Sequence, residues 1–465
     1  MTMAENKTIE TEAKPSGIQR RDFLKGAAFG AMGMLPMAAL FGCSPQRSEA
    51  VDSAGASASE TTGAATKADG EVMTLAEMNA FRKELIDSKS DYTCSDGVVI
   101  PAVYVKLRAL IDTYGNGVGS ELTDASFSEV MYHFSEEDAQ AYLEMPMGTY
   151  FTAVDYSVES GRSEAECLAI LEDLSSRGLL MRVRRGGVPY FHQLAEAHGI
   201  WEYCLLKEST AEYTTIHSSQ WGSDIIQQLY NADTPFYYAI PVNKEVVADE
   251  EILPYDDYEK IIARNSVFAV SNCQCRLSHE TIGTKDAGNH PLETCLTTGE
   301  QAEFYIENGI GREIDREEAL AILKRSVEAG MVLQSAWTKD TEVICSCHGD
   351  CCDILMSYVA LGDDYASLNS SMNVSHYSLK YDKDSCQKCG SCADRCPLSA
   401  ITIGEDGFPS TGLTCIRCGQ CGTICPASAR KLAQKDAESI PELPQSLLDD
   451  YNLKAEYRMR NGMIH

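Results

Sequence analysis

The sequence predicts a multidomain protein of the α+β class, and three observations lead to this fold class. Its 465 residues are enough for two or three domains with separate cores. Apolar residues recur at helical spacing through 73–210, whereas short apolar strands and helices share the cysteine-rich segment 211–380. Eight further cysteines, in two matched runs, lie in 381–432. We therefore expect a helical N-terminal domain, a central α/β domain and a small third domain built on its cysteines.

The composition limits the partners that the protein can have. The chain carries 39 Lys and Arg against 69 Asp and Glu, which gives a formal net charge of −30. Nucleic-acid binding needs a basic face that neutralises phosphates, so we expect no nucleic-acid partner. An acidic protein is instead suited to docking on a basic patch of another protein.

Residues 1–43 have the pattern of an export signal. The run QRRDFLK at 19–25, which contains Arg20 and Arg21, precedes a weakly apolar stretch that is short for a membrane span. The segment resembles the twin-arginine signal, with Gln where Ser or Thr is more usual. The resemblance implies that the protein crosses the membrane already folded. It is therefore expected in the periplasm or on the outer face of the cytoplasmic membrane.

Cys43 is a candidate site of lipidation. The sequence LFGC at 40–43 resembles a lipoprotein box, although Phe41 is bulkier than the residue usually found there. Acylation of Cys43 would anchor the protein to the membrane, and otherwise this cysteine belongs to a discarded peptide. Residues 44–72 are rich in Ser, Ala, Thr and Gly and have scarcely an aliphatic side chain, so we expect a flexible tether.

Residues 73–210 are predicted to be mainly helical. The spacing of apolar residues predicts helices over 74–89, 101–114 and 126–145. Ser163 and Glu166 then have the spacing of a capping box, which begins a further helix.

A hairpin is expected after that helix, because two β-rich runs flank Arg185-Gly186-Gly187. Helices followed by such a hairpin resemble a winged helix, a fold that binds DNA in some proteins and docks partner proteins in others. Arg182, Arg184 and Arg185 would lie on the wing, so a DNA-binding regulator remains an interpretation. The acidic composition and the export signal favour docking of a protein.

The segment 211–380 is predicted to combine strands and helices with a group of seven cysteines. Residues 236–242 and 266–270 are typical of buried strands, a helix is expected over 258–263, and Asp315 begins another. The cysteines follow the ends of predicted elements, and they are Cys273, Cys275, Cys295, Cys345, Cys347, Cys351 and Cys352.

Two copies of the pattern C-x2-C-x2-C-x3-C-P occupy 381–432. Gly390 and Gly419 follow the second cysteine of each copy, where the backbone must approach a bound group closely. Zinc ribbons pair C-x2-C units across a longer gap, so two matched four-cysteine runs favour iron–sulfur over zinc or disulfides. The cysteines are Cys386, Cys389, Cys392 and Cys396 in the first copy and Cys415, Cys418, Cys421 and Cys425 in the second.

These runs resemble those of bacterial-type 2[4Fe-4S] ferredoxins, over about residues 380–430. The resemblance implies a ferredoxin-like domain with two [4Fe-4S] clusters, in which the fourth cysteine of each run binds the other cluster. Residues 433–465 remain as a C-terminal tail. The implied ligands are Cys386, Cys389, Cys392 and Cys425 for cluster 1, and Cys415, Cys418, Cys421 and Cys396 for cluster 2.

Three interpretations of the seven central cysteines remain open. They are a third iron–sulfur cluster, a structural zinc site with His348 completing a Cys3His set, and disulfides. Labile clusters nearby argue against disulfides, so a metal site is favoured, and iron–sulfur more than zinc. Vicinal Cys351 and Cys352 can scarcely both bind one ion, so some of the seven are expected to be spare. Arg276 is placed to hydrogen-bond to cluster sulfur.

The arrangement CxCR…C…CxCxxxCC ahead of the paired runs is similar to that of a group of uncharacterised iron–sulfur proteins of anaerobes. The similarity implies a metal site in the central segment and little about a substrate. Gly288 stands where some members have another cysteine. This departure weakens any ligand set that needs four cysteines from the first half of the arrangement.

Together the motifs predict an exported electron-transfer protein that passes single electrons to or from an extracytoplasmic oxidoreductase. The alternative is an electron-input subunit or an enzyme with chemistry at the central cysteines, for which His279, His290 and His348 are candidate acid–base groups. A redox-sensing winged-helix regulator is a third possibility. The sequence has no dinucleotide-binding or phosphate-binding glycine motif. We therefore assign no catalytic residue, and an electron carrier is favoured over a stand-alone enzyme.

Overall fold

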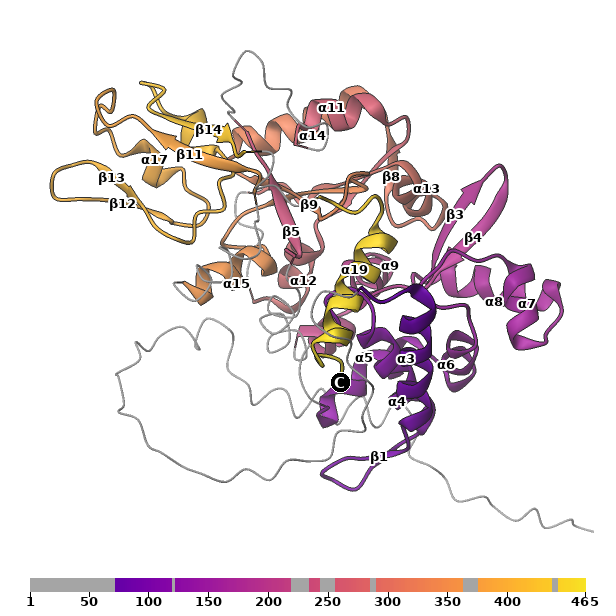
Figure 1. Cartoon of the computed structure of the whole chain (residues 1–465). Coiled ribbons are helices and arrows are strands. Elements are labelled where there is room, and N and C mark those ends of the chain that lie inside the picture. Colours follow the sequence, from indigo (N-terminus) through magenta and orange to yellow (C-terminus); the bar gives the residue numbers. More distant parts are fainter. Residues whose placement is uncertain are drawn as a thin grey trace, which may run out of the picture.

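The computed structural model of the chain describes residues 72–118, 122–218, 234–242, 256–284, 290–362, 375–436 and 442–465 (Figure 1). The predicted export signal with Arg20 and Arg21, the predicted lipidation site Cys43, the tether up to residue 71 and Gly288 lie outside the described residues. No helix in the described part of the chain is both long enough and apolar enough to cross a lipid bilayer.

The N-terminal part is helical, as the spacing of its apolar residues predicts. Thr74 begins the first helix with a capping box, in which its hydroxyl accepts from the Glu77 N–H. The elements are α3 (Leu75–Ser88), β1 (Tyr92–Thr93), β2 (Val99–Ile100), α4 (Ala102–Asp112), the 3₁₀ helix η1 (Asp124–Phe127), α5 (Ser128–His133), α6 (Glu136–Leu143), α7 (Ala153–Ser160) and α8 (Glu164–Ser176).

The single helix expected over 126–145 is wrong, because the chain there forms η1, α5 and α6. Phe134 and Ser135 have extended backbone between α5 and α6. Ser135 Oγ accepts from the Asp138 N–H, and the Asp138 carboxylate accepts from the Ser135 N–H. This capping box begins a new helix, and helical spacing of apolar residues alone does not reveal such a break.

The expected hairpin is formed by β3 (Met181–Arg185) and β4 (Val188–His192). Gly186 and Gly187 make its two-residue turn with φ of 61° and 80°, which glycine adopts without strain. The π-helical turn η2 (Glu196–Ile200), α9 (Trp201–Lys207) and a helix over 211–218 follow.

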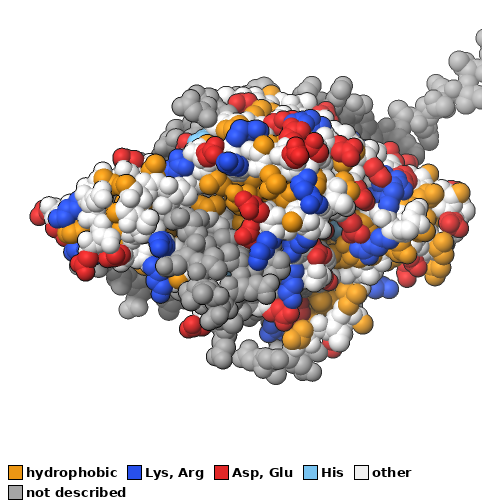
Figure 2. Space-filling view, turned by 90° about the horizontal axis from the view of Figure 1, so that it is seen from above, with side chains coloured by type: hydrophobic (Ala, Val, Ile, Leu, Met, Phe, Trp, Pro, Cys, Tyr) orange, Lys and Arg blue, Asp and Glu red, His pale blue; other side chains and the backbone are white. Residues whose placement is uncertain are grey.

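The arginines of this hairpin are paired with carboxylates of the same chain. Arg182 and Arg184 contact Glu307, and Arg185 contacts Glu300, both from the central part of the chain. Figure 2 shows Lys and Arg side chains interspersed with Asp and Glu on the face that it presents, without a continuous basic stripe on the described part of that face.

A six-stranded antiparallel sheet forms the middle of the molecule. Its order is β5-β9-β10-β7-β6-β8. Successive residues of β5 enter different cores, with Tyr238 against α11 and α14 and Tyr237 against the N-terminal part. The bounds are β5 (Tyr237–Ile240), α11 (Tyr258–Arg264), β6 (Phe268–Asn272), α12 (Gln274–Ile282), β7 (Glu293–Thr298), α13 (Gly299–Glu307), β8 (Arg312–Ile314), α14 (Arg316–Glu328), β9 (Val332–Ala336), β10 (Val343–Cys347) and α15 (Asp353–Leu361).

The cysteine runs at the C-terminal side form a small unit at one end of the molecule, opposite the N-terminal helices (Figure 1). Strand β11 (Tyr377–Tyr381) pairs with β14 (Arg430–Gln434), and these two strands enclose both runs in the sequence. Between them lie α17 (Ser391–Asp394), β12 (Ile401–Ile403), β13 (Pro409–Thr411) and α18 (Gln420–Thr423).

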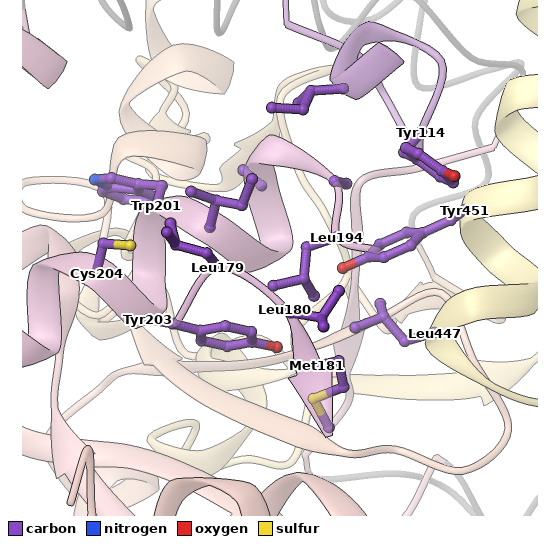
Figure 3. Close-up of a cluster of buried hydrophobic side chains, with 14 of the residues drawn as sticks. Tyr114, Leu179, Leu180, Met181, Leu194, Trp201, Tyr203, Cys204, Leu447 and Tyr451 are labelled. Carbon is purple, nitrogen blue, oxygen red and sulfur yellow. The ribbon is translucent and has the colours of Figure 1, made fainter. Parts of the chain in front are cut away.

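The last helix returns to the N-terminal part of the chain. Helix α19 (Leu447–Arg460) lies beside α3. Its Leu447 and Tyr451 point into the same apolar cluster as Leu180, Leu194 and Tyr203 (Figure 3). Residues 433–465 therefore contribute the end of β14 and a packed helix.

Candidate metal centres

The two cysteine runs fold as copies of one unit, 29 residues apart from Cys386 to Cys415. Gly390 precedes α17 with φ of 79°, and Gly419 precedes α18 with φ of 88°. The fourth cysteine sulfur of each run accepts a backbone N–H at 3.3 Å, from Ala400 in the first run and Ala429 in the second. Such N–H donors stabilise a thiolate and tune a bound cluster.

The first candidate centre is a cavity lined by the four cysteines that the ferredoxin resemblance assigns to cluster 1. Three come from the first run, and the fourth arrives from the end of the second run. Cys389 is exposed, so the centre lies at the surface. The lining sulfurs belong to Cys386, Cys389, Cys392 and Cys425.

The second candidate centre brings together the cysteines assigned to cluster 2. Burial raises the pKa of Cys418, and its neighbours Cys415, Cys421 and Cys396 raise it further. Thiolates this close together repel one another, so they are unstable without a counter-charge. A bound cationic iron centre supplies that counter-charge. The donor set therefore fits a cluster.

Arg430 lies between the two candidate centres. Its side chain is buried, contacts the ring of Tyr381 at 4.8 Å and donates to Thr411 Oγ1 at 2.9 Å. Its positive charge lowers the pKa of both Cys392 and Cys421, which burial otherwise raises. One buried guanidinium thus faces cysteines of both sites.

A third cavity lies in the central part, and six of the seven central cysteines line it. Neighbouring thiols are in hydrogen-bonding contact in the order 273, 275, 352, 347, 345, 295. None of the eighteen described cysteines forms a disulfide. The six are Cys273 and Cys275 at the start of α12, Cys295 in β7, Cys345 and Cys347 in β10, and Cys352 before α15.

The spacing of these six thiols differs from that of a mononuclear zinc site. A tetrahedral Zn–S distance of 2.3 Å places all the sulfur atoms about 3.8 Å apart. Within the described ranges, the only three candidate ligand atoms that all lie within 4.8 Å of one another belong to His290, Asp350 and Cys351. The six cavity thiols form an extended row instead, which suits a polynuclear cluster whose thiolates sit on separate iron atoms.

Cys351 lies apart from the other six, although it precedes Cys352 in the sequence. Its sulfur is 3.9 Å from Arg276 Nη1. Arg276 is fully buried, and its Nη1 also donates to the Ser346 carbonyl at 3.0 Å. The charge of Arg276 also contributes, after the hydrogen bond from Cys275, to lowering the pKa of Cys273 to about 7. Arg276 thus stands between the cavity and Cys351.

Polar side chains complete the wall of the central cavity. His198 is buried, its Nδ1 lies 2.9 Å from Tyr237 Oη and 3.2 Å from a Glu202 carboxylate oxygen, and no group in the described residues pairs with its Nε2. Gln334 Nε2 and Ser346 Oγ line the same cavity and are also buried without a partner in the described residues. These three groups are therefore available to hydrogen-bond to a group bound in the cavity.

Of the histidines singled out in the sequence, none lines this cavity. His279 lies at its edge, with Nε2 3.0 Å from Asp353, and His290 and His348 contact Asp350 outside the cavity. The histidine in the cavity is His198, which sequence reasoning missed. Its position in the N-terminal part, far from any cysteine motif, carries no signal of this role.

The segments that carry the second candidate centre contact the central part of the chain at two places. The Val242 N–H donates to the Cys418 carbonyl at 2.9 Å, and a Cβ at Gly419 would collide with the Val242 carbonyl oxygen. The Gly349 N–H donates to the Pro397 carbonyl at 3.0 Å, which joins the turn after β10 to the end of the first run. The second candidate centre therefore packs against the central part of the chain, whereas Cys389 of the first candidate centre is exposed.

Residues 379–402 match the family model described as a 4Fe-4S binding domain. This part of the chain is therefore a ferredoxin-like, iron–sulfur-binding region with the capacity for electron transfer. Comparison with curated proteins and with solved structures finds no significant match to the chain.

Proposed function

We propose that the protein is an electron carrier with two [4Fe-4S] clusters in 381–432 and a third cluster in the central cavity. The observation that carries this proposal is the closure of the first site by Cys425, a residue of the second run, around the segment that matches a 4Fe-4S binding domain. A [4Fe-4S] cluster supplies exchange of one electron. The residues of the chain supply thiolates, N–H donors and the buried charge of Arg430.

The arrangement of the sites supports a relay with one open end. Cys389 is exposed, whereas Cys418 packs on the central core and none of the six central cysteines is exposed. A partner that docks beside Cys389 would therefore exchange electrons with cluster 1 first, then with cluster 2 and the central centre. The acidic character of the chain suits a partner with a basic docking surface.

The proposal includes export and a lipid anchor. It rests on Arg20, Arg21 and Cys43, with residues 44–72 as the tether to the membrane. Cell fractionation tests this part independently of metal content: membrane-bound protein outside the cytoplasm is expected, and Cys43→Ser should release it. Full-length protein in the cytoplasm would contradict export and favour a redox-sensing regulator, an interpretation that the ion pairs of Arg182, Arg184 and Arg185 do not support.

Iron analysis tests the number of clusters. After anaerobic purification we expect about twelve iron atoms and as many sulfides per chain, since each [4Fe-4S] cluster holds four of each. The double variant Cys345→Ala/Cys347→Ala should retain about eight, because two neighbouring thiolates of the central cavity are lost.

A matched control removes a buried cysteine that lies at none of the three sites. Cys94→Ala should leave the iron content unchanged, because Cys94 packs in the N-terminal core. Equal iron in the wild type and the Cys345/Cys347 variant would refute the third cluster and leave the two-cluster proposal standing.

A second candidate function is favoured by the polar wall of the central cavity. His198 Nε2 and Gln334 Nε2 are placed to hydrogen-bond to a small molecule beside the thiols. The chain would then be an enzyme, or the electron-input subunit of one, with its chemistry at this cavity. A change in the spectrum of the central centre on adding a small ligand, absent in His198→Phe, would support this function.

A further inference from the structure

His290, His348, Asp350 and Cys351 come together outside the central cavity. His290 lies just before β7, and the other three lie in the turn after β10. These strands pair antiparallel, with Val343 opposite Thr297, so the end of β10 meets the start of β7. The sheet therefore brings together two segments that lie far apart in the sequence.

The distances among three of these groups suit ligands of one ion, and the fourth, His348, contacts one of the three. His290 Nε2 is 3.4 Å from Asp350 Oδ2, His348 Nδ1 is 2.8 Å from Asp350 Oδ1, and the two imidazole rings are 4.5 Å apart. Single atoms of His290, Asp350 and Cys351 all lie within 4.8 Å of one another. Ligands at 2.0–2.3 Å from a tetrahedral zinc are about 3.3–3.8 Å apart. Small side-chain adjustments would bring these three groups around one centre, and His348, which already contacts Asp350, would turn towards the ion as the fourth ligand.

The chemistry of the donors also differs from that of the cavity. Two imidazoles, one carboxylate and one thiolate form a borderline set that Zn²⁺ accepts in a closed four-coordinate site. The carboxylate and the thiolate balance the charge of the ion. The side chain of Asp350 is 54% exposed, which leaves a route for the metal, while Cys351 is buried. Arg276 Nη1, 3.9 Å from the Cys351 sulfur, would remain beside the bound thiolate.

We propose that His290, His348, Asp350 and Cys351 bind one Zn²⁺ ion in a mononuclear site that is separate from the six-thiol cavity. This site divides the vicinal pair, with Cys351 on zinc and Cys352 facing the cavity. The zinc ties the segment before β7 to the turn after β10. It thereby fixes the backbone between Cys347 and Cys352, two of the cavity thiols.

Zinc analysis and zinc K-edge X-ray absorption test the proposal on the full chain, purified anaerobically from zinc-supplemented cells. We expect about one zinc per chain, with one sulfur ligand near 2.3 Å and three nitrogen or oxygen ligands near 2.0–2.1 Å. Asp350→Asn and Cys351→Ser should lose the zinc and keep the iron and sulfide of the wild type. Because the Asp350 side chain is exposed, Asp350→Asn should fold as the wild type does, and its zinc loss then reports on the site.

The reciprocal control is Cys345→Ala/Cys347→Ala, which should keep its zinc whatever happens to its iron. Absence of zinc from the wild type after incubation with Zn²⁺ would overturn the proposal. A shell of three sulfurs would do so in favour of a Cys3His site, and a shell without sulfur would show an adventitious ion only. Iron loss in Cys351→Ser would make Cys351 a cluster ligand. Because the cluster proposal depends on iron and the zinc proposal on zinc, each can fail without the other.

Discussion

At the scale of single residues, Arg430 is the most consequential neighbour of the paired cysteine runs. It is buried, and its charge acts on cysteines of both candidate clusters. Reduction adds negative charge to a cluster, so a nearby buried cation favours the reduced state. Arg430 should therefore raise both potentials, against the negative field of the acidic chain.

We expect Arg430→Met to lower the reduction potentials of the two clusters proposed for 381–432. A unit charge about 6–8 Å away, at an effective dielectric constant near 20, contributes roughly 2–3 kcal/mol, or about 90–120 mV for one electron. Anaerobic redox titration followed by electron paramagnetic resonance measures the shift. Arg430→Lys keeps the charge and should shift the potentials less. Arg312→Met removes a charge that is exposed and paired with Glu293, and should leave the potentials unchanged.

The residue scale also shows how far the sequence predicts the sites. Cysteine spacing predicts the two runs because their thiols lie within one short segment whose turns are local. The separation of Cys351 from Cys352 could not be predicted, since it depends on the direction in which each side chain leaves the turn. His198 was missed because only the packing of η2 against β5 brings it to the cavity.

At the scale of elements, strand β4 ends at a buried titratable group. His192 is 2% exposed, and its ring packs edge-on against Tyr150 at 5.0 Å. Burial lowers the pKa of His192 to about 4, because the charged imidazolium would lose its hydration. The unfolded chain, with an ordinary histidine pKa near 6.5, binds this proton more readily. Folding stability therefore falls as the pH drops from about 6.5 towards 4.

This linkage gives a pH-dependent prediction. Between pH 7.5 and 5.5 the contribution of His192 to the free energy of unfolding should fall by roughly 1 kcal/mol. His192→Gln carries no titratable group, so its stability should change less over the same interval. Anaerobic urea unfolding of both proteins at the two pH values measures the difference. Identical pH dependence of the two would show that His192 is not the group responsible, because every other titrating group is shared.

The elements also differ in how well the sequence predicts them. Helices α3 and α8 begin at capping boxes that the sequence displays, and α14 begins at Asp315 as expected. The single helix expected over 126–145 was wrong because Ser135, inside a region of helical spacing, is the N-cap of a new helix. The hairpin β3–β4 was predicted correctly because its two glycines permit the positive φ of the turn.

At the scale of the whole molecule, a buried ion pair joins the two ends of the described chain. Asp112 at the end of α4 accepts from Arg458 Nη2 of α19 at 2.8 Å, and neither side chain is exposed. Burial alone would raise the pKa of Asp112, but Arg458 and Arg108 hold it below its ordinary value. No sequence pattern predicts this pair, because nothing in residues 433–465 indicates which part of the chain they pack against.

We expect Asp112→Asn to destabilise the protein by about 3–5 kcal/mol, because it leaves the charge of Arg458 buried without its counterion. Arg460→Met on the same helix is the matched control. Its partner Glu456 lies one turn away and Arg460 is partly exposed, so the loss should stay below about 1 kcal/mol. Urea unfolding of both variants measures the contrast. Similar small losses in the two would mean that α19 contributes little to the stability of the N-terminal part.

Because α19 packs on the N-terminal part, that part cannot complete its core until the end of the chain has been synthesised. Asp112 leaves the ribosome 346 residues before Arg458. At about 5–20 residues per second, this delay lasts roughly 17–70 s. During that interval the nascent N-terminal part lacks the side chains of Leu447 and Tyr451 that close its core. All eighteen described cysteines are synthesised before α19. Iron can therefore reach these cysteines before α19 packs on the N-terminal part.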